Sequence, residues 1–264
     1  MKKLFALVPI IALIGMATIM STGCIAAVRG VGGMVEKEQE ITGSFTSIRI
    51  SNALNVTFRH GDEHTVTATM QENLFELLVI DISANTLNVI MSQNFRVSIG
   101  YTPRIVITAP QLSSISLANA TTGYVQSAIT GDAFRVYLSG ASTISVPNLG
   151  VNTLYVNASG ASSATLGGNI AVFANVFASG ASTIALGGNA TTAWLSASGA
   201  SDIRALNLQA RYSSVAASGA SHVRIAVSET LSVTATGASS VRYRGNPTII
   251  SQTLYGASTL RRVD

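Results

Sequence analysis

The second half of the chain alternates apolar and polar residues on both sides of a short motif that keeps returning. The motif is Ser-Gly-Ala-Ser or a close variant, and its glycines are 20, 20, 19, 20, 18 and 19 residues apart. These glycines are Gly140, Gly160, Gly180, Gly199, Gly219, Gly237 and Gly256. Most positions two and four residues before each glycine, and four and six after it, are apolar. Alternation with period two predicts two short strands per repeat, each with one buried face.

Such a repeat can be a series of hairpins or a coil that returns to its starting point in every repeat. In a coil, equivalent residues lie over one another, which explains why the same small residues recur in register. We therefore predict an all-β protein, a right-handed single-stranded parallel β-helix (β-solenoid) with about 20 residues per rung. Glycine permits the left-handed backbone of a sharp corner, and the serines can bond local backbone groups or one another. The alanine-rich inner columns predict a narrow interior without room for a ligand.

The region before these rungs alternates less regularly. The predicted strands there are 47–50, 54–59, 65–70, 77–82, 86–91, 96–99 and 104–108. Asn52-Ala53 and Asn119-Ala120-Thr121 resemble the Gly-Ala-Ser corner, so the solenoid can begin near residue 45 with longer excursions. We expect one β-solenoid domain over residues 41–264, with irregular N-terminal strands in 41–112 and regular rungs in 113–264. Whether both parts form one solenoid or two domains stays open.

The first 23 residues have the layout of an export signal. Two lysines precede an apolar run over residues 4–20, and small residues follow it. Cys24, the only cysteine, comes directly after Thr22-Gly23. This segment resembles the lipobox of bacterial lipoproteins, which implies a lipidated cysteine at the new N-terminus. Ser21 departs from the lipobox, which prefers leucine there.

The alternatives are an ordinary signal peptide with an incidental cysteine, and an uncleaved anchor. We expect residues 1–23 to be a signal peptide and residues 24–40 to be the lipidated cysteine and a flexible tether. The chain has 16 basic and 12 acidic residues. Without the two lysines of the leader it would be only mildly basic, and we expect no nucleic-acid partner.

Several of these features together resemble the head GIN domain family. The resemblance rests on the leader with its cysteine, on Phe45-x-x-Ile48-x-Ile50-x-x-Ala53, on a Val56…Gly61…Val66 hairpin, on Leu87-x-Val89 and on the Gly-Ala-Ser rungs. It covers about residues 41–260. Members of the family are labelled auto-transporter adhesins and are largely uncharacterised. The resemblance implies an exported β-helical protein, often lipid-anchored, without an established activity.

One outward column of the rungs is basic. Arg204, Arg224, Arg242 and Arg261 each stand five residues after a corner glycine. Stacked arginines repel one another unless something neutralises them. An anionic partner, such as an acidic polysaccharide or a lipid headgroup, is one interpretation. The other is a solvated face with some pairing to Asp202 and Asp264.

A second candidate surface lies on the strand before the corner. Outward positions there hold Tyr137, Tyr155, Phe177 and Trp194, with Arg135 nearby. On consecutive rungs they would form a flat exposed strip, which needs an explanation. Such a strip can stack on sugar rings or on a partner chain. It can equally be covered by residues 41–112 or by a second copy of the protein.

Metal and catalytic chemistry find little support. His60 and His64 flank two carboxylates in a turn, but no third ligand has a fixed spacing, so we expect no metal and no cofactor. β-Helical polysaccharide lyases and hydrolases resemble this architecture and use clustered aspartates. Here Asp132 and Asp202 are several rungs apart, and no nucleophile elbow or phosphate loop is present. We expect the chain not to be an enzyme.

The sequence therefore predicts a non-catalytic, exported and membrane-tethered module for surface adhesion, binding or envelope structure. Its expected place is the outer membrane, the cell surface or the periplasm, where the lipid is its membrane partner. A glycan or an envelope protein is the other expected partner. The alternatives are a carbohydrate-active β-helix enzyme acting on an acidic polysaccharide, and self-association through an open solenoid end. The ligand and the oligomeric state stay open.

Overall fold

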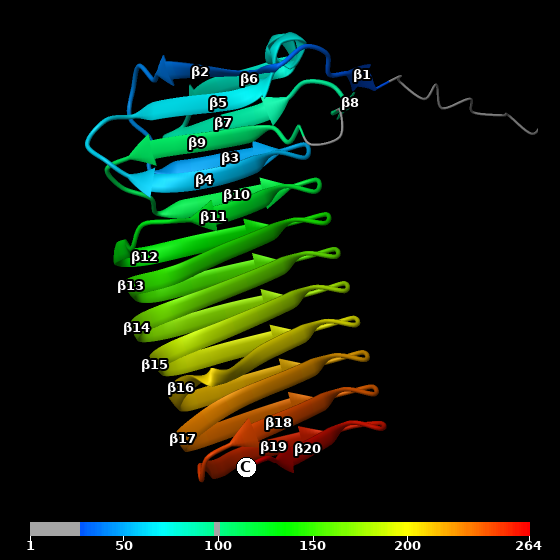
Figure 1. Ribbon diagram of the computed structural model, residues 1–264. Coiled ribbons are helices and arrows are strands. Elements are labelled where there is room, and N and C mark those ends of the chain that lie inside the picture. Colours follow the sequence, from blue (N-terminus) through cyan, green and yellow to red (C-terminus); the bar gives the residue numbers. More distant parts are fainter. Residues whose placement is uncertain (1–26, 98–100) are drawn as a thin grey trace, which may run out of the picture.

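Most of the described backbone is β-strand, joined by turns and one short 3₁₀ helix. The computed structural model describes residues 27–97 and 101–264, so the predicted signal peptide and Cys24 lie outside the described residues. Eighteen strands form one continuous sheet that winds around a buried core, and Figure 1 shows the rungs stacked into a rod. The predicted all-β solenoid is confirmed, with about seven turns of about 20 residues each.

The strands fall into an N-terminal group and a group of regular rungs. The first group is β1 (Val28–Arg29), β2 (Met34–Glu40), β3 (Ser47–Ser51), β4 (Asn55–His60), β5 (Thr65–Gln71), β6 (Leu78–Ser83), β7 (Thr86–Met91), β8 (Phe95–Arg96) and β9 (Arg104–Ala109), with the short 3₁₀ helix η1 (Glu72–Leu77). The second is β10 (Ser114–Ala118), β11 (Thr122–Val125), β12 (Ile129–Leu138), β13 (Thr143–Ala158), β14 (Ser163–Ala178), β15 (Thr183–Ala197), β16 (Asp202–Ala217), β17 (His222–Ala235), β18 (Ser240–Arg244), β19 (Thr248–Leu254) and β20 (Thr259–Arg262).

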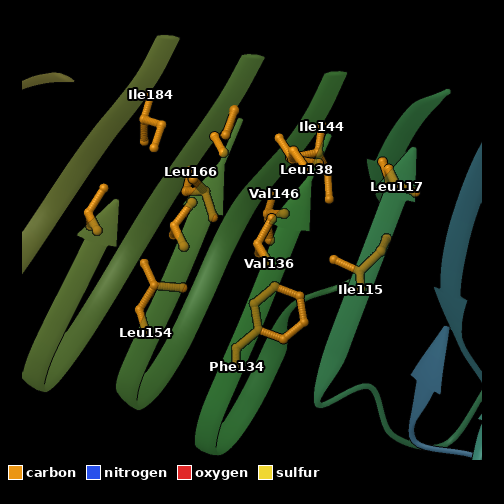
Figure 2. Packing of buried hydrophobic residues seen from close by; sticks show 14 of the residues in the cluster. Ile115, Leu117, Phe134, Val136, Leu138, Ile144, Val146, Leu154, Leu166 and Ile184 are labelled. Carbon is orange, nitrogen blue, oxygen red and sulfur yellow. The ribbon is translucent and has the colours of Figure 1, made fainter. Parts of the chain in front are cut away.

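The rungs are flattened, so the sheet forms two walls that face each other across the core. The pre-corner wall contains β6, β7, β3, β10, β12, the second halves of β13 to β17, and β19. The post-corner wall contains β2, β5, β9, β4, β11, the first halves of β13 to β17, β18 and β20. Figure 2 shows apolar side chains of both walls, such as Val136 and Val146, between the two layers. Both of these valines are fully buried.

Each sharp corner depends on its glycine. The corner glycines of the regular rungs all have φ between +70° and +73°, a region that L-residues rarely adopt. They also stack closely, because Ala161 N donates a hydrogen bond of 2.7 Å to Gly140 O, and later rungs repeat this contact. A Cβ on Gly180 would lie 2.8 Å from Gly160 O. Both the conformation and the space therefore require glycine.

The last serine of each regular corner is largely or fully buried and satisfies a backbone carbonyl. Ser142 Oγ donates to Ser139 O of its own corner at 2.7 Å, whereas Ser182 Oγ donates to Ala158 O of the preceding rung at 3.1 Å. The predicted bonding of corner serines to the backbone is thus confirmed. Among the described residues, no buried side-chain nitrogen or oxygen lacks a partner.

The N-terminal region belongs to the same solenoid. Strand β3 pairs in parallel with β10, so that Ile48 lies beside Ile115. Asn52 has φ +70° and Asn119 has φ +55°, and Asn119 Nδ2 donates to Asn52 Oδ1 at 3.0 Å. These asparagines therefore form left-handed corners that stack as the glycines do. A single apolar core runs from Phe45 to Val241.

Two expectations for the N-terminal region are wrong. The hairpin around Gly61 does not form, because β9 lies between β4 and β5, parallel to β4 and antiparallel to β5. Residues 34–40 are not part of a flexible tether, because β2 pairs with β5 along its whole length. Backbone hydrogen bonds hold β2 in place, and its polar side chains gave no apolar signal in the sequence.

In the described part of the chain, no helix could span a membrane.

Candidate binding surface

The four aromatic residues predicted on the pre-corner wall do point outward, but they do not form a single file. The strand register places them in two neighbouring columns, three and five residues before the corner. The first column is Tyr137, Asn157, Phe177 and Ser196. The second column is Arg135, Tyr155, Asn175 and Trp194. We call these eight residues the aromatic–amide face.

Within this face, each rung offers one ring and one polar side chain, and the two exchange columns at every step. Tyr137 lies in the first column, Tyr155 of the next rung in the second, and Phe177 of the following rung in the first again. The expectation of a continuous aromatic strip is therefore corrected to an alternating pattern. The rings can alternate between columns because positions three and five before the corner both point outward, so a ring can occupy either position.

The rings of this face are open to solvent. Tyr137 is 44% exposed, Phe177 is 45% exposed and Trp194 is 54% exposed. Tyr155 is half-buried, and the Arg135 guanidinium carbon lies 5.3 Å from the centre of its ring. Residues 41–112 do not cover these rings, since that region stacks on the end of the rod and continues both walls.

Two further aromatic residues extend the surface and were missed in the sequence. Phe173 and Tyr212 belong to a third outward column, with Thr192 between them. The rings of Phe173 and Trp194 meet edge to face, with their centres 5.0 Å apart. All three residues stand seven before the following corner glycine, so the count that gave the first two columns would also have found this one had it been carried two residues further.

The amides of the face are available to a ligand. Asn157 is exposed and Asn175 is half-buried. Neither side chain forms a hydrogen bond, ion pair or ring contact with any residue that the structure describes. A primary amide offers two donors and two acceptor lone pairs. The strand register places Asn157 between Tyr137 and Phe177. It likewise places Asn175 between Tyr155 and Trp194, so each of these amides lies beside aromatic rings of the neighbouring rungs.

The bend opposite the corners carries a second polar surface. Asn169, Asn189 and Gln209 stack on three successive rungs. They line a hollow of about 380 Å³ together with Thr191 and Arg211. Arg211 lies 4.0 Å from Glu229, so this hollow is not strongly charged.

The predicted arginine column on the post-corner wall is in register. The strand register places Arg204 beside Arg224, Arg224 beside Arg242, and Arg242 beside Arg261. Asp202 accepts from Arg204 Nε at 2.7 Å and from Arg224 Nη1 at 3.4 Å, so its expected pairing is confirmed.

The other two arginines of the column have no acidic partner among the described residues. Neither Arg242 nor Arg261 has an ion pair within the described chain, and the expected pairing to Asp264 is not found. The positive charge of the column is therefore least compensated on β18 and β20.

The acidic and histidine residues considered for metal or catalytic chemistry are held apart. His64 packs its ring edge against Phe45, with the ring centres 4.9 Å apart. Asp132 accepts a hydrogen bond from Asn152 Nδ2 at 3.0 Å. Among residues 27–97 and 101–264, no three His, Cys, Asp or Glu side chains come together as a metal site.

Solved structures with the same fold are known. Two described as a "putative adhesin", from Parabacteroides merdae and Parabacteroides distasonis, each superpose with a TM-score of 0.79 at 19% identity. They cover 90% of this chain, and the match covers 99% and 100% of theirs. A "putative lipid binding protein" from Parabacteroides distasonis has a TM-score of 0.77 at 16% identity, with 90% of this chain and 100% of that chain covered. At these identities the likeness shows the fold alone.

The sequence itself gives the family. No curated protein matches the chain. A family model, in contrast, matches residues 44–174 and 171–247, which is most of the chain. The matched residues run from the start of the solenoid through most of its regular rungs. The chain therefore belongs to the family described as "Putative auto-transporter adhesin, head GIN domain".

Proposed function

We propose that this protein is an exported, non-catalytic adhesin module that binds a glycan through the aromatic–amide face. The observation that carries the proposal is the combination, on one wall, of exposed rings with amides that have no partner among the residues that the structure describes. A sugar ring has an apolar face that packs on aromatic side chains and hydroxyl groups at its edge that need donors and acceptors. Membership of an adhesin-type family supports a binding role.

The state of the acidic residues favours binding over hydrolysis. Asp202 is held by two arginines, and Asp132 accepts a hydrogen bond from an asparagine on the neighbouring rung. Glycoside hydrolysis needs two carboxyl groups that face each other across the bond to be broken. The carbohydrate-active enzyme is therefore the less favoured hypothesis. A glycan-degradation screen with the purified protein tests it, and released oligosaccharides would support the enzyme.

Glycan-array binding of the purified protein tests the main proposal. Trp194→Ala should lower binding about tenfold, because it removes a ring that is 54% exposed and able to pack on a sugar. Tyr124→Ala is the matched control, because Tyr124 is 45% exposed but lies on the post-corner wall, beside Thr57 and Ser145. Equal loss with both variants, or no glycan binding at all, would contradict the proposal.

The arginine column supports a second, anionic contact. We expect it at Arg242 and Arg261, which have no carboxylate partner in the described chain, more than at Arg204 and Arg224, which share Asp202. A sulfated or phosphorylated polysaccharide, or a lipid headgroup, has suitable charge. Replacing both Arg242 and Arg261 by Ser should shorten retention on heparin more than replacing Arg204 and Arg224. The reverse order would contradict this location.

The proposal includes a lipid tether at Cys24, which would hold the module at the outer membrane, on the cell surface or in the periplasm. The support is the leader before Cys24, since the chain has no other cysteine. Metabolic labelling with a palmitate analogue should mark the wild-type protein and not Cys24→Ser. Labelling of both, or of neither, would contradict the tether without affecting the glycan site.

A further inference from the structure

We infer that the ligand of the aromatic–amide face is an extended β-1,4-linked glycan whose chain runs along the solenoid axis, across β12 to β15. This inference rests on the proposed glycan-binding function and narrows it to one linkage. It follows from the order of rings and polar groups along the two columns, not from the presence of aromatic residues alone.

The two columns are parallel to the axis and close enough to contact one chain. Neighbouring rungs are about 4.8 Å apart, and positions two residues apart on a strand are separated by about 7 Å. Each rung carries one ring and one polar group on this face. In chain order these are Tyr137 and Arg135, Tyr155 and Asn157, Phe177 and Asn175, and Trp194 and Ser196. The ring is in the first, second, first and second column in turn. The pattern therefore repeats after two rungs, or about 9.6 Å.

An extended β-1,4-linked chain has the same symmetry. Each pyranose is turned over relative to the one before it, so the hydroxymethyl group alternates between the left and right edges of the chain. The rise of one sugar is close to the spacing of one rung, and an equivalent sugar returns after two. A chain lying between the columns would meet, at every sugar, a ring on one side and a hydrogen-bonding group on the other. The two sides would exchange at each step, as the edges of the chain do.

Other common linkages do not fit this pattern. An α-1,4-linked chain curls, and a β-1,3-linked chain winds into a wide helix, so neither keeps a straight two-sugar repeat over four rungs. The protein surface is also fixed in place. Backbone pairing sets the rung spacing, and the Trp194 ring meets the Phe173 ring edge to face, with the ring centres 5.0 Å apart. A rigid platform of this kind favours a straight ligand. Neither the protein surface nor a glycan that is already extended loses much conformational entropy when the two bind.

Calorimetry with four hexasaccharides tests the linkage. The probes are cellohexaose and chitohexaose, which are β-1,4-linked, and maltohexaose and laminarihexaose, which are α-1,4-linked and β-1,3-linked. We expect at least one β-1,4-linked probe to bind at least about tenfold more tightly than either of the others, a difference of one good contact. Equal or tighter binding of maltohexaose or laminarihexaose overturns the inference.

A swap variant tests the alternation itself. Asn175→Trp combined with Trp194→Asn keeps the composition but places two rings on the rung of Phe177 and none on the rung of Ser196. It should weaken binding of the β-1,4-linked probe about tenfold, as should Trp194→Ala alone, whereas Tyr124→Ala should leave it unchanged.

The outcomes separate this inference from the proposed function. If the swap binds as tightly as wild type while Trp194→Ala is weakened, the glycan site stands and the alternation argument is wrong. If Trp194→Ala has no effect, or no glycan binds, the proposed function fails and this inference fails with it.

Discussion

At the glycine corners, the absence of a Cβ atom allows the rung to close. The corner glycines combine a left-handed backbone with a contact to the glycine of the preceding rung that leaves no room for a side chain. Asn52 and Asn119 achieve related corners without glycine, because asparagine tolerates this conformation better than most residues. The corner therefore keeps a similar shape in rungs whose corner sequence differs.

Gly180→Val should destabilise the protein by at least about 1–2 kcal/mol, the cost of a left-handed conformation for an L-residue. The clash of the new Cβ with Gly160 O adds to this cost. Thermal unfolding followed by circular dichroism measures it. Gly150→Ala is the control, because its Cβ would meet no atom closer than 3.5 Å. Equal melting temperatures for both variants would show that the corner does not need glycine.

Asp202 controls how much positive charge the arginine column presents. Asp202→Asn should increase retention on heparin, because Arg204 and Arg224 lose their shared carboxylate. The loss of stability should stay below about 1 kcal/mol, since the Arg204 side chain is 58% exposed. Glu229→Gln changes the net charge equally but next to Arg211, away from the column. If both variants shift retention alike, net charge and not the column governs binding.

At the scale of elements, the strands at the two ends of the post-corner wall are the most polar. β2 pairs only with β5 among the described strands, and β20 pairs only with β18. β2 carries three glutamates, and β20 ends with Arg261 and Arg262. Charged edge strands resist pairing with other chains, because association would desolvate those charges. The charges on these strands thus reduce unwanted edge-to-edge contact.

Hydrogen exchange followed by NMR tests the pairing of β2. About half of the amides of residues 34–40 should be protected, because alternate N–H groups in an antiparallel pair point toward the partner strand. The other half point away from β5 and should exchange quickly. Exchange at the rate of an unstructured peptide throughout would support the flexible tether instead.

At the scale of the whole molecule, the irregular and regular regions form one body. Strands β3 and β4 form the first rung, the strands up to β9 extend both walls on one side of it, and β10 continues on the other side of β3. The first rung is thus placed between strands that come later in the sequence. Its residues are part of the same apolar core as the regular rungs.

Ile48→Ala should therefore affect both regions. Ile48 is 1% exposed, so its truncation should cost about 2–5 kcal/mol. Hydrogen exchange should accelerate in β10, where Ile115 lies beside it, as well as in β7, where Leu87 does. Faster exchange confined to residues 41–112 would indicate two independent domains.

Counting from the corner glycine was sufficient to predict much of the candidate site. The column of Arg204, Arg224, Arg242 and Arg261 was predicted in this way and is in register. The count succeeded because parallel pairing keeps equal offsets from a corner on neighbouring rungs. Phe173 and Tyr212 were missed because the count stopped five residues before the glycine, although both stand seven before it and lie in one column.

The sequence by itself determined the rung length, the corner chemistry, the alternation of buried and exposed positions and the family. All of these follow from local periodicity, since each position is fixed by its distance from the nearest corner. Only the tertiary structure decided that β9 separates β4 from β5, that β2 is a strand, and that Asp202 bridges two arginines. These depend on pairing between distant segments and on side-chain reach, which periodicity does not encode. The exchange of rings and amides between columns is already present in the sequence, because the four rings stand three, five, three and five residues before their glycines, and parallel stacking turns these offsets into a surface pattern.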